Sequence, residues 1–306
     1  MIKPNTMTTA TYAISSSLEQ ELLSTGEYRV SLSRAEYDEL HRAIGVVGTL
    51  WYLEESYDVL LQNAVELETA VGRLEATQRA YISSFPDEVD LELRLLNRLL
   101  INFLASARAF VDSVRARLSR SDDLDGSKLA VFDAFFSKQF DAVFSYRLMD
   151  ALRNHTQHQS AAISQNLTFI RTWRSSDEKS TKMLSVSPQV ERDGLVNNRK
   201  LNSKTRREIA EKCELMIDLM PHLTAYVQCF ARVVDQARAL YQPEYDAALA
   251  THAALLKEYL ADEWAAVWVT PTGDPDRRET LWTGAHDLRR IYRIRLRNVA
   301  RDPVPT

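Results

Sequence analysis

Apolar residues recur at three- and four-residue steps over long stretches of the chain, a spacing typical of amphipathic helices. One stretch runs from about Leu50 to Ala80 and a second from about Asp87 to Arg120, with Pro86 breaking the pattern between them. The sequence Ser33-Arg34-Ala35-Glu36 is a capping box, in which a hydroxyl and a carboxylate satisfy amide donors at a helix start. We therefore expect a helix to begin there, and a mainly α fold overall.

A fourth helical stretch carries aromatic residues on its apolar face. Phenylalanines recur at every fourth position from Phe132 to Phe140, and the apolar pattern continues to Leu152. Long helices joined by short polar turns favour an antiparallel bundle, because a short connection forces neighbouring helices to run in opposite directions. We expect this bundle to occupy residues 35–165, after a polar leader at residues 1–34.

β-Forming residues dominate two short segments, Leu167 to Arg174 and Lys182 to Val186, and a polar stretch separates them. Two such segments around a polar turn predict a β-hairpin. We therefore expect a hairpin and a loop at residues 166–201.

Residues 202–306 are expected to form additional helices and a short mixed segment that packs on the core. Helical periodicity runs from about Ser203 to Leu240, with a kink expected at Pro221, and again from Pro243 to about Trp264. Apolar and basic residues alternate from Ile291 to Arg297, which predicts a strand near the C-terminus.

Composition narrows the class of protein. The hydrophobic content of 45% allows a substantial buried core, whereas the net charge of −4 gives no overall attraction for nucleic acid. The most apolar window, Leu95 to Leu104, is interrupted by polar residues and is too short to cross a bilayer. Cys213 and Cys229 lie too far apart for a metal knuckle and do not suggest a disulfide framework. We expect a cytoplasmic protein without a membrane span.

Arg153 and His158 are separated by four residues, and the polar Asn154 directly follows the arginine. This motif, near the expected end of the aromatic helix, resembles the signature of the HEPN superfamily of all-α bundles. The resemblance covers mainly residues 87–165. It includes the run from Leu96 to Leu104, which is similar to the partner helix of uncharacterised bacterial and phage members.

A second arginine–histidine pair provides an internal comparison. Arg34 and His41 are separated by six residues, which the HEPN spacing of four to six also allows. However, Arg34 precedes the apolar Ala35 in the first turn of an expected helix, whereas Arg153 precedes a polar residue near a helix end. We therefore assign the motif to Arg153, Asn154 and His158.

Helix geometry is compatible with this assignment. Asn154 and His158 share a face if the helix continues, and Arg153 lies about 140° around the axis from His158, within reach of its long side chain. His155 points about 160–200° away from the side of Arg153 and is less suited to join them. The secondary candidates for the site are His155, Asp150 and Asn102.

The resemblance implies metal-independent cleavage of RNA, in which the ribose 2′-hydroxyl attacks the adjacent phosphate and leaves a cyclic phosphate. His158 would move the protons, since an imidazole with a pKa of about 6.5 is available in both forms near neutral pH. Arg153 would stabilise charge on the phosphate through its forked donors, and Asn154 would orient His158 or a phosphate oxygen. No cofactor or metal is implied.

Partners also follow from the resemblance. Many HEPN nucleases dimerise so that two motifs line one cleft, so we expect a homodimer that acts on RNA. The resemblance suggests a toxin–antitoxin, abortive-infection or phage-defence setting, with an antitoxin or another protein as a partner.

Plainer interpretations of the motif stay open. Arg153 can pair with Asp150, three residues before it, on a solvated helix end. The fold can also be a non-catalytic HEPN-like module that binds a nucleotide, RNA or a protein. His155 and His158, three positions apart, supply at most half of a zinc site.

A basic run near the C-terminus is the candidate RNA-binding surface. On the expected strand, alternation places Arg293, Arg295 and Arg297 on one face. That face either holds an RNA backbone or is a solvated surface that opposes acidic residues elsewhere.

Overall fold

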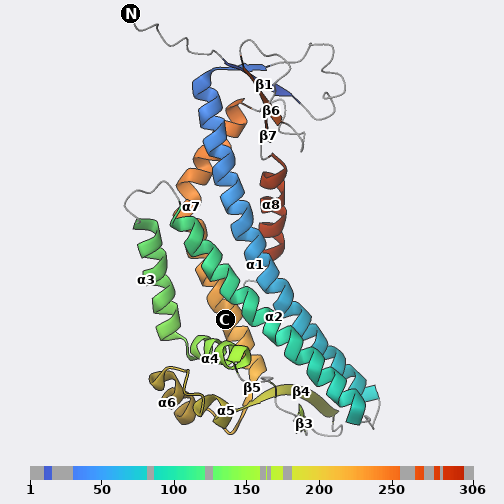
Figure 1. The fold of residues 1–306 in the computed structure, drawn as a ribbon. Helices are drawn as coiled ribbons and strands as arrows, with labels where there is room; N and C mark the ends of the chain where they lie inside the picture. The colour runs from blue at the N-terminus through green and yellow to red at the C-terminus, as the bar shows by residue number, and fades with distance from the viewer. Residues whose placement is uncertain are drawn as a thin grey trace, which may run out of the picture. The chain divides into compact units, whose positions relative to one another are not determined.

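The computed structural model describes residues 10–15, 30–80, 86–120, 127–158, 163, 167–174, 181–255, 266–271, 279–282 and 285–299. Its helices are α1 (Arg34–Ala80), α2 (Pro86–Leu118), α3 (Ser127–Ala142), α4 (Phe144–His158), α5 (Arg192–Val196), α6 (Ser203–Lys212), α7 (Leu219–Leu255) and α8 (Ala285–Val299). Its strands are β1 (Ala10–Ser15), β2 (Val30–Leu32), β3 (Leu167–Arg174), β4 (Thr181–Glu191), β5 (Met216–Asp218), β6 (Ala266–Pro271) and β7 (Glu279–Trp282). The expected mainly α fold with a small β-hairpin is confirmed (Figure 1).

The hairpin lies where the sequence predicted it. β3 and β4 are antiparallel, with Leu167 opposite Pro188 and Arg174 opposite Thr181. β5 pairs with the C-terminal end of β4 and extends the hairpin to three strands. A second antiparallel sheet has the strand order β2-β1-β6-β7. Its strands β1 and β2 belong to the polar leader, for which the pattern predicted no strand.

The chain divides into two units, each built from segments that are far apart in the sequence. The smaller unit consists of residues 1–55 and 238–301, and the larger unit consists of residues 56–237 and 302–306. α1 and α7 therefore each contribute one part to either unit.

The larger unit contains an antiparallel pair formed by α1 and α2. The rings of Tyr57 and Phe110 lie 5.8 Å apart near one end of this pair. Arg73 and Glu92 form an ion pair of 3.0 Å near the other end. Both helices bury their apolar positions, among them Leu60, Leu67, Leu74, Leu96, Leu100 and Leu104. This burial explains why the apolar periodicity predicted α2 and the part of α1 from Leu50 onward, whereas α1 itself runs unbroken from Arg34.

In the smaller unit, the capping box predicted at the start of α1 is present. The amide of Glu36 donates to Ser33 Oγ at 3.2 Å, and the amide of Ser33 donates to Glu36 Oε2 at 2.7 Å. Further along α1, the fully buried carboxylate of Glu54 pairs with Arg238 at 2.7 Å and with Arg295 at 2.6 Å. Because a buried carboxylate requires a compensating charge, these pairs tie α7 and α8 to α1.

The strand predicted from Ile291 to Arg297 is wrong, because these residues belong to α8. Ile291 is fully buried, and Arg295, one helical turn later, reaches Glu54. Successive helical residues are rotated by about 100°, so Arg295 points to the side opposite from Arg293 and Arg297. The three arginines do not form the common face that a strand would have given them.

The aromatic helix expected to continue to Arg153 is divided at Val143 into α3 and α4 (Figure 1). Arg147 Nη1 donates to the carbonyl groups of Phe140 and Asp141, both at 2.6 Å. The last carbonyl groups of a helix lack intrahelical partners, so an arginine of α4 satisfies the end of α3. No glycine or proline stands at the break, which is why the pattern did not predict it.

The boundaries of α6 and α7 also differ from the expectation. The helix predicted to run from 203 to 240 with a kink at Pro221 is instead interrupted by β5. Asp218 accepts a hydrogen bond of 2.9 Å from the amide two residues later, and Pro221 lies in the first turn of α7, where proline is tolerated. Pro243, where a new helix was predicted to begin, lies inside α7.

Candidate functional site

α4 is buried around most of its circumference and leaves one narrow outer face. Its buried residues are Tyr146, Arg147, Leu148, Met149, Ala151, Leu152 and His155. The less buried positions Asp150, Arg153, Asn154 and Gln157 follow helical spacing and share one side of the helix. We call these four residues the outer stripe of α4. It contains two of the three residues of the predicted motif.

Arg147 anchors α4 from the buried side. Its guanidinium donates to both carboxylate oxygens of Glu208 on α6, at 2.6 and 2.7 Å. The Arg147 guanidinium lowers the pKa of Glu208 to about 2, and Lys212 adds to this effect from a distance of 2.7 Å. Such bidentate pairing fixes the orientation of both groups, so it holds the outer stripe in place.

Arg153, on the outer stripe, has different surroundings. Its Nη1 donates a long hydrogen bond of 3.3 Å to Oδ1 of Asn154, and its Nε is buried without a hydrogen-bond partner. Within the described part of the chain, no carboxylate forms an ion pair with this guanidinium. Most of its donors are therefore not engaged by the described residues. A phosphate or carboxylate ligand has the oxygen geometry that matches such donors.

Asp150 brings a carboxylate to the same face. Burial raises the pKa of Asp150, while the positive charges of Arg153 and Arg108 lower it. Arg108, on α2, also forms an i, i+4 ion pair with Asp112 at 2.9 Å. Its electrostatic effect on Asp150 adds a second cation to the surroundings of the outer stripe. The sequence gave no sign that Arg108 lies near Asp150, because this proximity depends on how α2 packs against α4.

Two buried tyrosines lie near Asp150. The rings of Tyr146 on α4 and Tyr226 on α7 are 4.8 Å apart. Burial raises the pKa of both phenols, and the charge of Asp150 adds to the increase. Both phenols are consequently neutral near physiological pH, and both lie close enough to Asp150 for its charge to act on them.

His155 lies on the buried side of α4, next to α5. Its Cε1 is 3.7 Å from the position that a Cβ would take at Gly194. Burial lowers the pKa of His155, and its Nδ1 has no hydrogen-bond partner. The imidazole is therefore neutral and packed, and the structure does not bring it together with Arg153.

The remaining predicted residues occupy separate positions. His158 is the last residue of α4, and its side chain lies outside the described residues. By helical periodicity its main chain follows Asn154 on the same side. Asn102 is exposed on α2, and among the described residues no hydrogen bond joins it to the outer stripe. The structure thus brings together Asp150, Arg153 and Asn154.

The other arginine sites have carboxylate partners. Arg34, in the comparison pair with His41, forms an i, i+4 ion pair with Asp38 at 2.9 Å. Arg295, predicted to bind RNA, has a side chain only 23% exposed, directed at Glu54. That prediction is wrong for Arg295, because the buried carboxylate already occupies its guanidinium.

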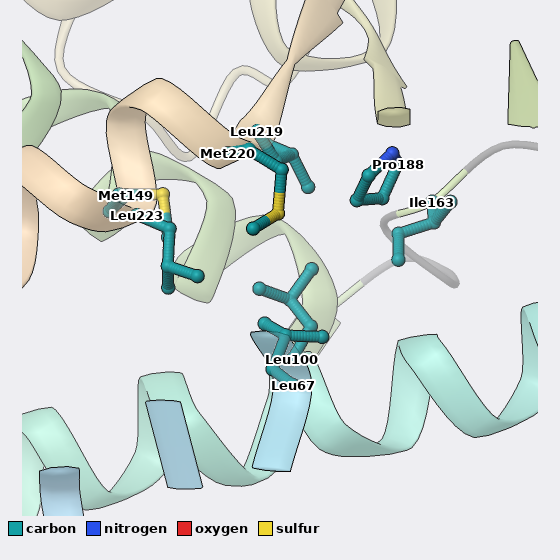
Figure 2. A pocket seen from close by; sticks show the side chains of 8 residues that line it. All are labelled: Leu67, Leu100, Met149, Ile163, Pro188, Leu219, Met220 and Leu223. Carbon is teal, nitrogen blue, oxygen red and sulfur yellow. The ribbon is translucent and has the colours of Figure 1, made fainter. Parts of the chain in front are cut away.

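A cavity of about 10 Å³ borders the buried side of α4 at Met149 (Figure 2). Figure 2 shows that its lining comes from several elements, with the side chains of Leu67, Leu100, Met149, Ile163, Pro188, Leu219, Met220 and Leu223. None of these side chains can exchange a proton or hold a water molecule by hydrogen bonding. The cavity is therefore a packing void, and the polar chemistry lies on the outer stripe.

Among the described residues, no three His, Cys, Asp or Glu side chains are arranged to hold a metal ion. None of the described helices combines the length and apolar character of a membrane-crossing segment. Cys229 is buried and Cys213 is partly buried, and both are free thiols.

Comparisons with protein-family models, curated proteins and solved structures found no match for this chain.

Proposed function

We propose that this chain is a metal-independent endoribonuclease of the HEPN type, with its site on the outer stripe of α4. The observation that carries the proposal is the environment of Arg153. Its guanidinium forms no ion pair with a described carboxylate, although Arg147 on the same helix is fully paired. A guanidinium on a helix, with N–H donors that the described residues do not use, suits a phosphodiester, because it can bind two phosphate oxygens at once.

The proposed reaction needs no group beyond acid, base and cation. The ribose 2′-hydroxyl attacks the adjacent phosphorus, the 5′-oxygen of the next nucleotide leaves, and a 2′,3′-cyclic phosphate results. Arg153 stabilises the negative charge that grows on the phosphate oxygens, and Asn154 orients Arg153 through the hydrogen bond of 3.3 Å. The proton transfers are assigned to His158, on the spacing of the motif alone.

A homodimer is part of this proposal. The base that accepts the 2′-hydroxyl proton and the acid that protonates the leaving oxygen act on opposite sides of one phosphate. One imidazole does not serve both positions in a single step, so a second copy of the chain would supply the other His158. Growth arrest on expression, relieved by an antitoxin or another protein, is the biological role that fits such an enzyme.

A second candidate function rests on Asp150. A carboxylate on the same face as Arg153 repels a phosphate unless it is protonated or neutralised, and burial already raises the pKa of Asp150. Binding of a phosphate at this face does not require cleavage, so the same groups also suit a non-catalytic HEPN-like module that binds a nucleotide, RNA or a protein. The two functions differ in whether RNA is cut, not in where it binds.

The test is cleavage of RNA by the purified chain in the presence of EDTA. Total tRNA and a random 20-nucleotide RNA serve as substrates, and a fully 2′-O-methylated oligonucleotide serves as the chemical control. We expect cleavage that leaves cyclic phosphate ends, and a loss of about 100-fold or more in Arg153→Ala. The matched control is Arg34→Ala, which removes the arginine of the other arginine–histidine pair and should cleave at the wild-type rate.

Three outcomes would count against the enzyme. EDTA could abolish the cleavage, the 2′-O-methylated oligonucleotide could be cut, or Arg153→Ala could cleave as fast as the wild type. If the wild type binds RNA and Arg153→Ala does not, while neither cuts it, the binding module is the correct function.

A further inference from the structure

A cluster of basic side chains lies on the turn between α5 and α6 and on the first turns of α6. Residues 199–207 contain five basic residues and no acidic one, a local charge of +5 in a chain whose net charge is −4. Four of the five side chains are exposed, and that of Arg206 is partly buried. We call the five residues the basic turn: Arg199, Lys200, Lys204, Arg206 and Arg207.

The side chains of the basic turn have no partner among the described residues. Within that part of the chain, no ion pair, hydrogen bond or ring contact involves any of them, and Nε of Arg206 is buried without a hydrogen-bond partner. The basic residues on either side of the turn differ. Arg192 pairs with Asp193 at 3.0 Å, and Lys212 pairs with Glu208 at 2.7 Å. The five cations of the basic turn are therefore available to an anionic ligand.

Local main-chain hydrogen bonds define the shape of the turn. Oδ1 of Asn198 accepts from the amide of Lys200 at 3.0 Å, and Oδ1 of Asn202 accepts from the amide of Lys204 at 2.8 Å. The side chain of Leu201 is buried beneath the turn's main chain. These interactions use asparagine side chains, amides and an apolar side chain, so they order the turn without engaging its cations. Binding to an ordered turn costs less conformational entropy than binding to a flexible loop.

The basic turn belongs to a segment that packs against α4 (Figure 1). On α5, a Cβ at Gly194 would lie 3.7 Å from Cε1 of His155, and on α6, Glu208 pairs with Arg147. The basic turn lies between these two contacts in the sequence, within the same unit as the outer stripe. Arg153 is six residues after Arg147, about 9 Å along α4. A strand of 20 nucleotides, at about 3.4 Å for each, is long enough to contact both.

The chemistry of the basic turn limits its ligand. Residues 199–207 include no aromatic side chain that could stack on a base, so the turn suits phosphates and not bases. A membrane surface is a poorer match, because segments that lie on membranes combine basic residues with apolar side chains that enter the bilayer. The apolar side chain of this stretch, Leu201, is buried. A linear polyphosphate backbone therefore fits best.

We propose that the basic turn binds the phosphate backbone of single-stranded RNA and so holds the substrate of the ribonuclease beside α4. Contacts to phosphates supply affinity and positioning and carry no sequence information. The choice of RNA among polyanions rests on the proposed function, whereas the binding uses no residue of the outer stripe. RNA binding by the turn is consequently strongly salt-dependent and insensitive to base sequence.

Binding is measured by fluorescence anisotropy with a fluorescein-labelled, fully 2′-O-methylated 20-nucleotide oligouridylate in EDTA. This RNA keeps its phosphates but lacks the attacking 2′-hydroxyl, so the full wild-type chain can be used without cleavage of the probe. One test variant carries Arg199→Glu and Arg207→Glu, and a second carries Lys200→Glu and Lys204→Glu. Thermal unfolding verifies that each variant is folded.

The matched control carries Arg42→Glu and Arg98→Glu. Both arginines are exposed and lie outside the basic turn, and neither has an ion-pair partner among the described residues. The control therefore changes the net charge by the same amount as each test variant. It should bind within about twofold of the wild type, because salt screens charges that are distant from the bound strand.

We expect each test variant to weaken binding at least tenfold and to make the salt dependence shallower by about 1.4 in log–log slope, the loss of two phosphate contacts on a single strand. A 2′-O-methylated oligoadenylate should bind as tightly as the oligouridylate. Equal losses in the control and in the test variants would overturn the proposal, because net charge alone would then explain them. Unchanged affinity and salt slope in both test variants would overturn it too.

A membrane ligand is tested with the same variants. Cosedimentation with vesicles of equimolar phosphatidylcholine and phosphatidylserine measures binding to an anionic surface. If the test variants lost vesicle binding and kept RNA binding, the basic turn would be a membrane-surface site and the proposal would be wrong. Loss of RNA binding in the test variants, with no vesicle binding by the wild type, would support it.

The outcome for the basic turn is separate from that for the proposed function. RNA binding that depends on the basic turn, without cleavage of unmethylated RNA by the wild type, would support the basic turn and reject the nuclease. Cleavage that depends on Arg153, with RNA binding unaffected in both test variants, would support the nuclease and reject the basic turn.

Discussion

Arg147 and Arg153 lie six residues apart on α4 and have opposite surroundings. The side chain of Arg147 is 10% exposed, pairs with both oxygens of Glu208 and donates to two carbonyl groups at the end of α3. Arg153 lies on the outer stripe and has one long hydrogen bond to Asn154. One helix thus carries an arginine that is paired with both oxygens of a carboxylate and another that forms no ion pair with a described carboxylate, although the charge of Asp150 lies near it.

The different surroundings of Arg147 and Arg153 predict different roles, with Arg147 needed for stability and Arg153 for function. Removing one partner of a buried ion pair leaves the other charge uncompensated, so Arg147 should matter for folding. Arg153 is partly exposed, and among the described residues its side chain forms no hydrogen bond or ion pair with another element, so we expect it to matter less for folding and to be available to a ligand. The comparison therefore predicts which substitution unfolds the protein and which removes only its activity.

The largest expected effect is on stability in Arg147→Met. The variant leaves the Glu208 carboxylate, which is 15% exposed, without its main counterion and leaves two carbonyl groups at the end of α3 unsatisfied. We expect the free energy of unfolding to fall by about 3–5 kcal/mol. Urea denaturation at neutral pH measures this. Adding Glu208→Gln should cost less than the sum of the two single changes, and a loss below about 1 kcal/mol for Arg147→Met would contradict the assignment.

Acid should weaken the ion pair between Arg147 and Glu208. The pKa of Glu208 is lowered to about 2 in the folded state, mainly by Arg147, so ionisation of this carboxylate favours folding. Its contribution is complete above the unfolded pKa of about 4.3 and is lost as pH falls through about 2. Urea titrations between pH 6 and pH 2 should show a smaller decline in Glu208→Gln than in the wild type. Parallel declines would show that this pair does not stabilise the fold.

A smaller effect on stability is expected for Arg153→Met. The substitution keeps an apolar stem and removes a guanidinium whose Nε is buried without a partner. The free energy of unfolding should change by less than about 1 kcal/mol in either direction, while RNA cleavage is lost. The same urea and cleavage measurements serve here. If this variant were as unstable as Arg147→Met, the two arginines would have the same structural role and the comparison would fail.

The smallest effect is expected at the buried side of α4, in Gly194→Ala. The added Cβ would lie 3.7 Å from Cε1 of His155, an ordinary van der Waals distance, and would restrict the unfolded chain. We expect the free energy of unfolding to rise by about 0.4–1 kcal/mol, with cleavage unchanged. Thermal and urea unfolding measure the gain. A marked loss of stability would mean that His155 packs against α5 more tightly than the structure indicates.

Local interactions made several features predictable from the sequence. The apolar periodicity of α1 and α2 reflects burial of one face of each helix, and the capping box at Ser33 needs only four consecutive residues. The β3–β4 hairpin is likewise a local structure. The position of the arginine–histidine motif on a helix was predictable for the same reason, whereas the domain boundaries at 34, 165 and 201 and the role of His158 stay predictions.

Contacts between distant segments decided the rest. The sequence of α8 is compatible with either a strand or a helix. In the helix, Ile291 is buried and Arg295 pairs with Glu54, which lies 241 positions away in the sequence. The break at Val143 accompanies hydrogen bonds from Arg147 that no local pattern encodes. The sequence alone therefore determined most of the long helices, though not α8, and the place of the candidate motif near the end of a helix. Only the tertiary structure decided which arginines are neutralised, because the carboxylates that pair with Arg147 and Arg295 come from distant parts of the chain.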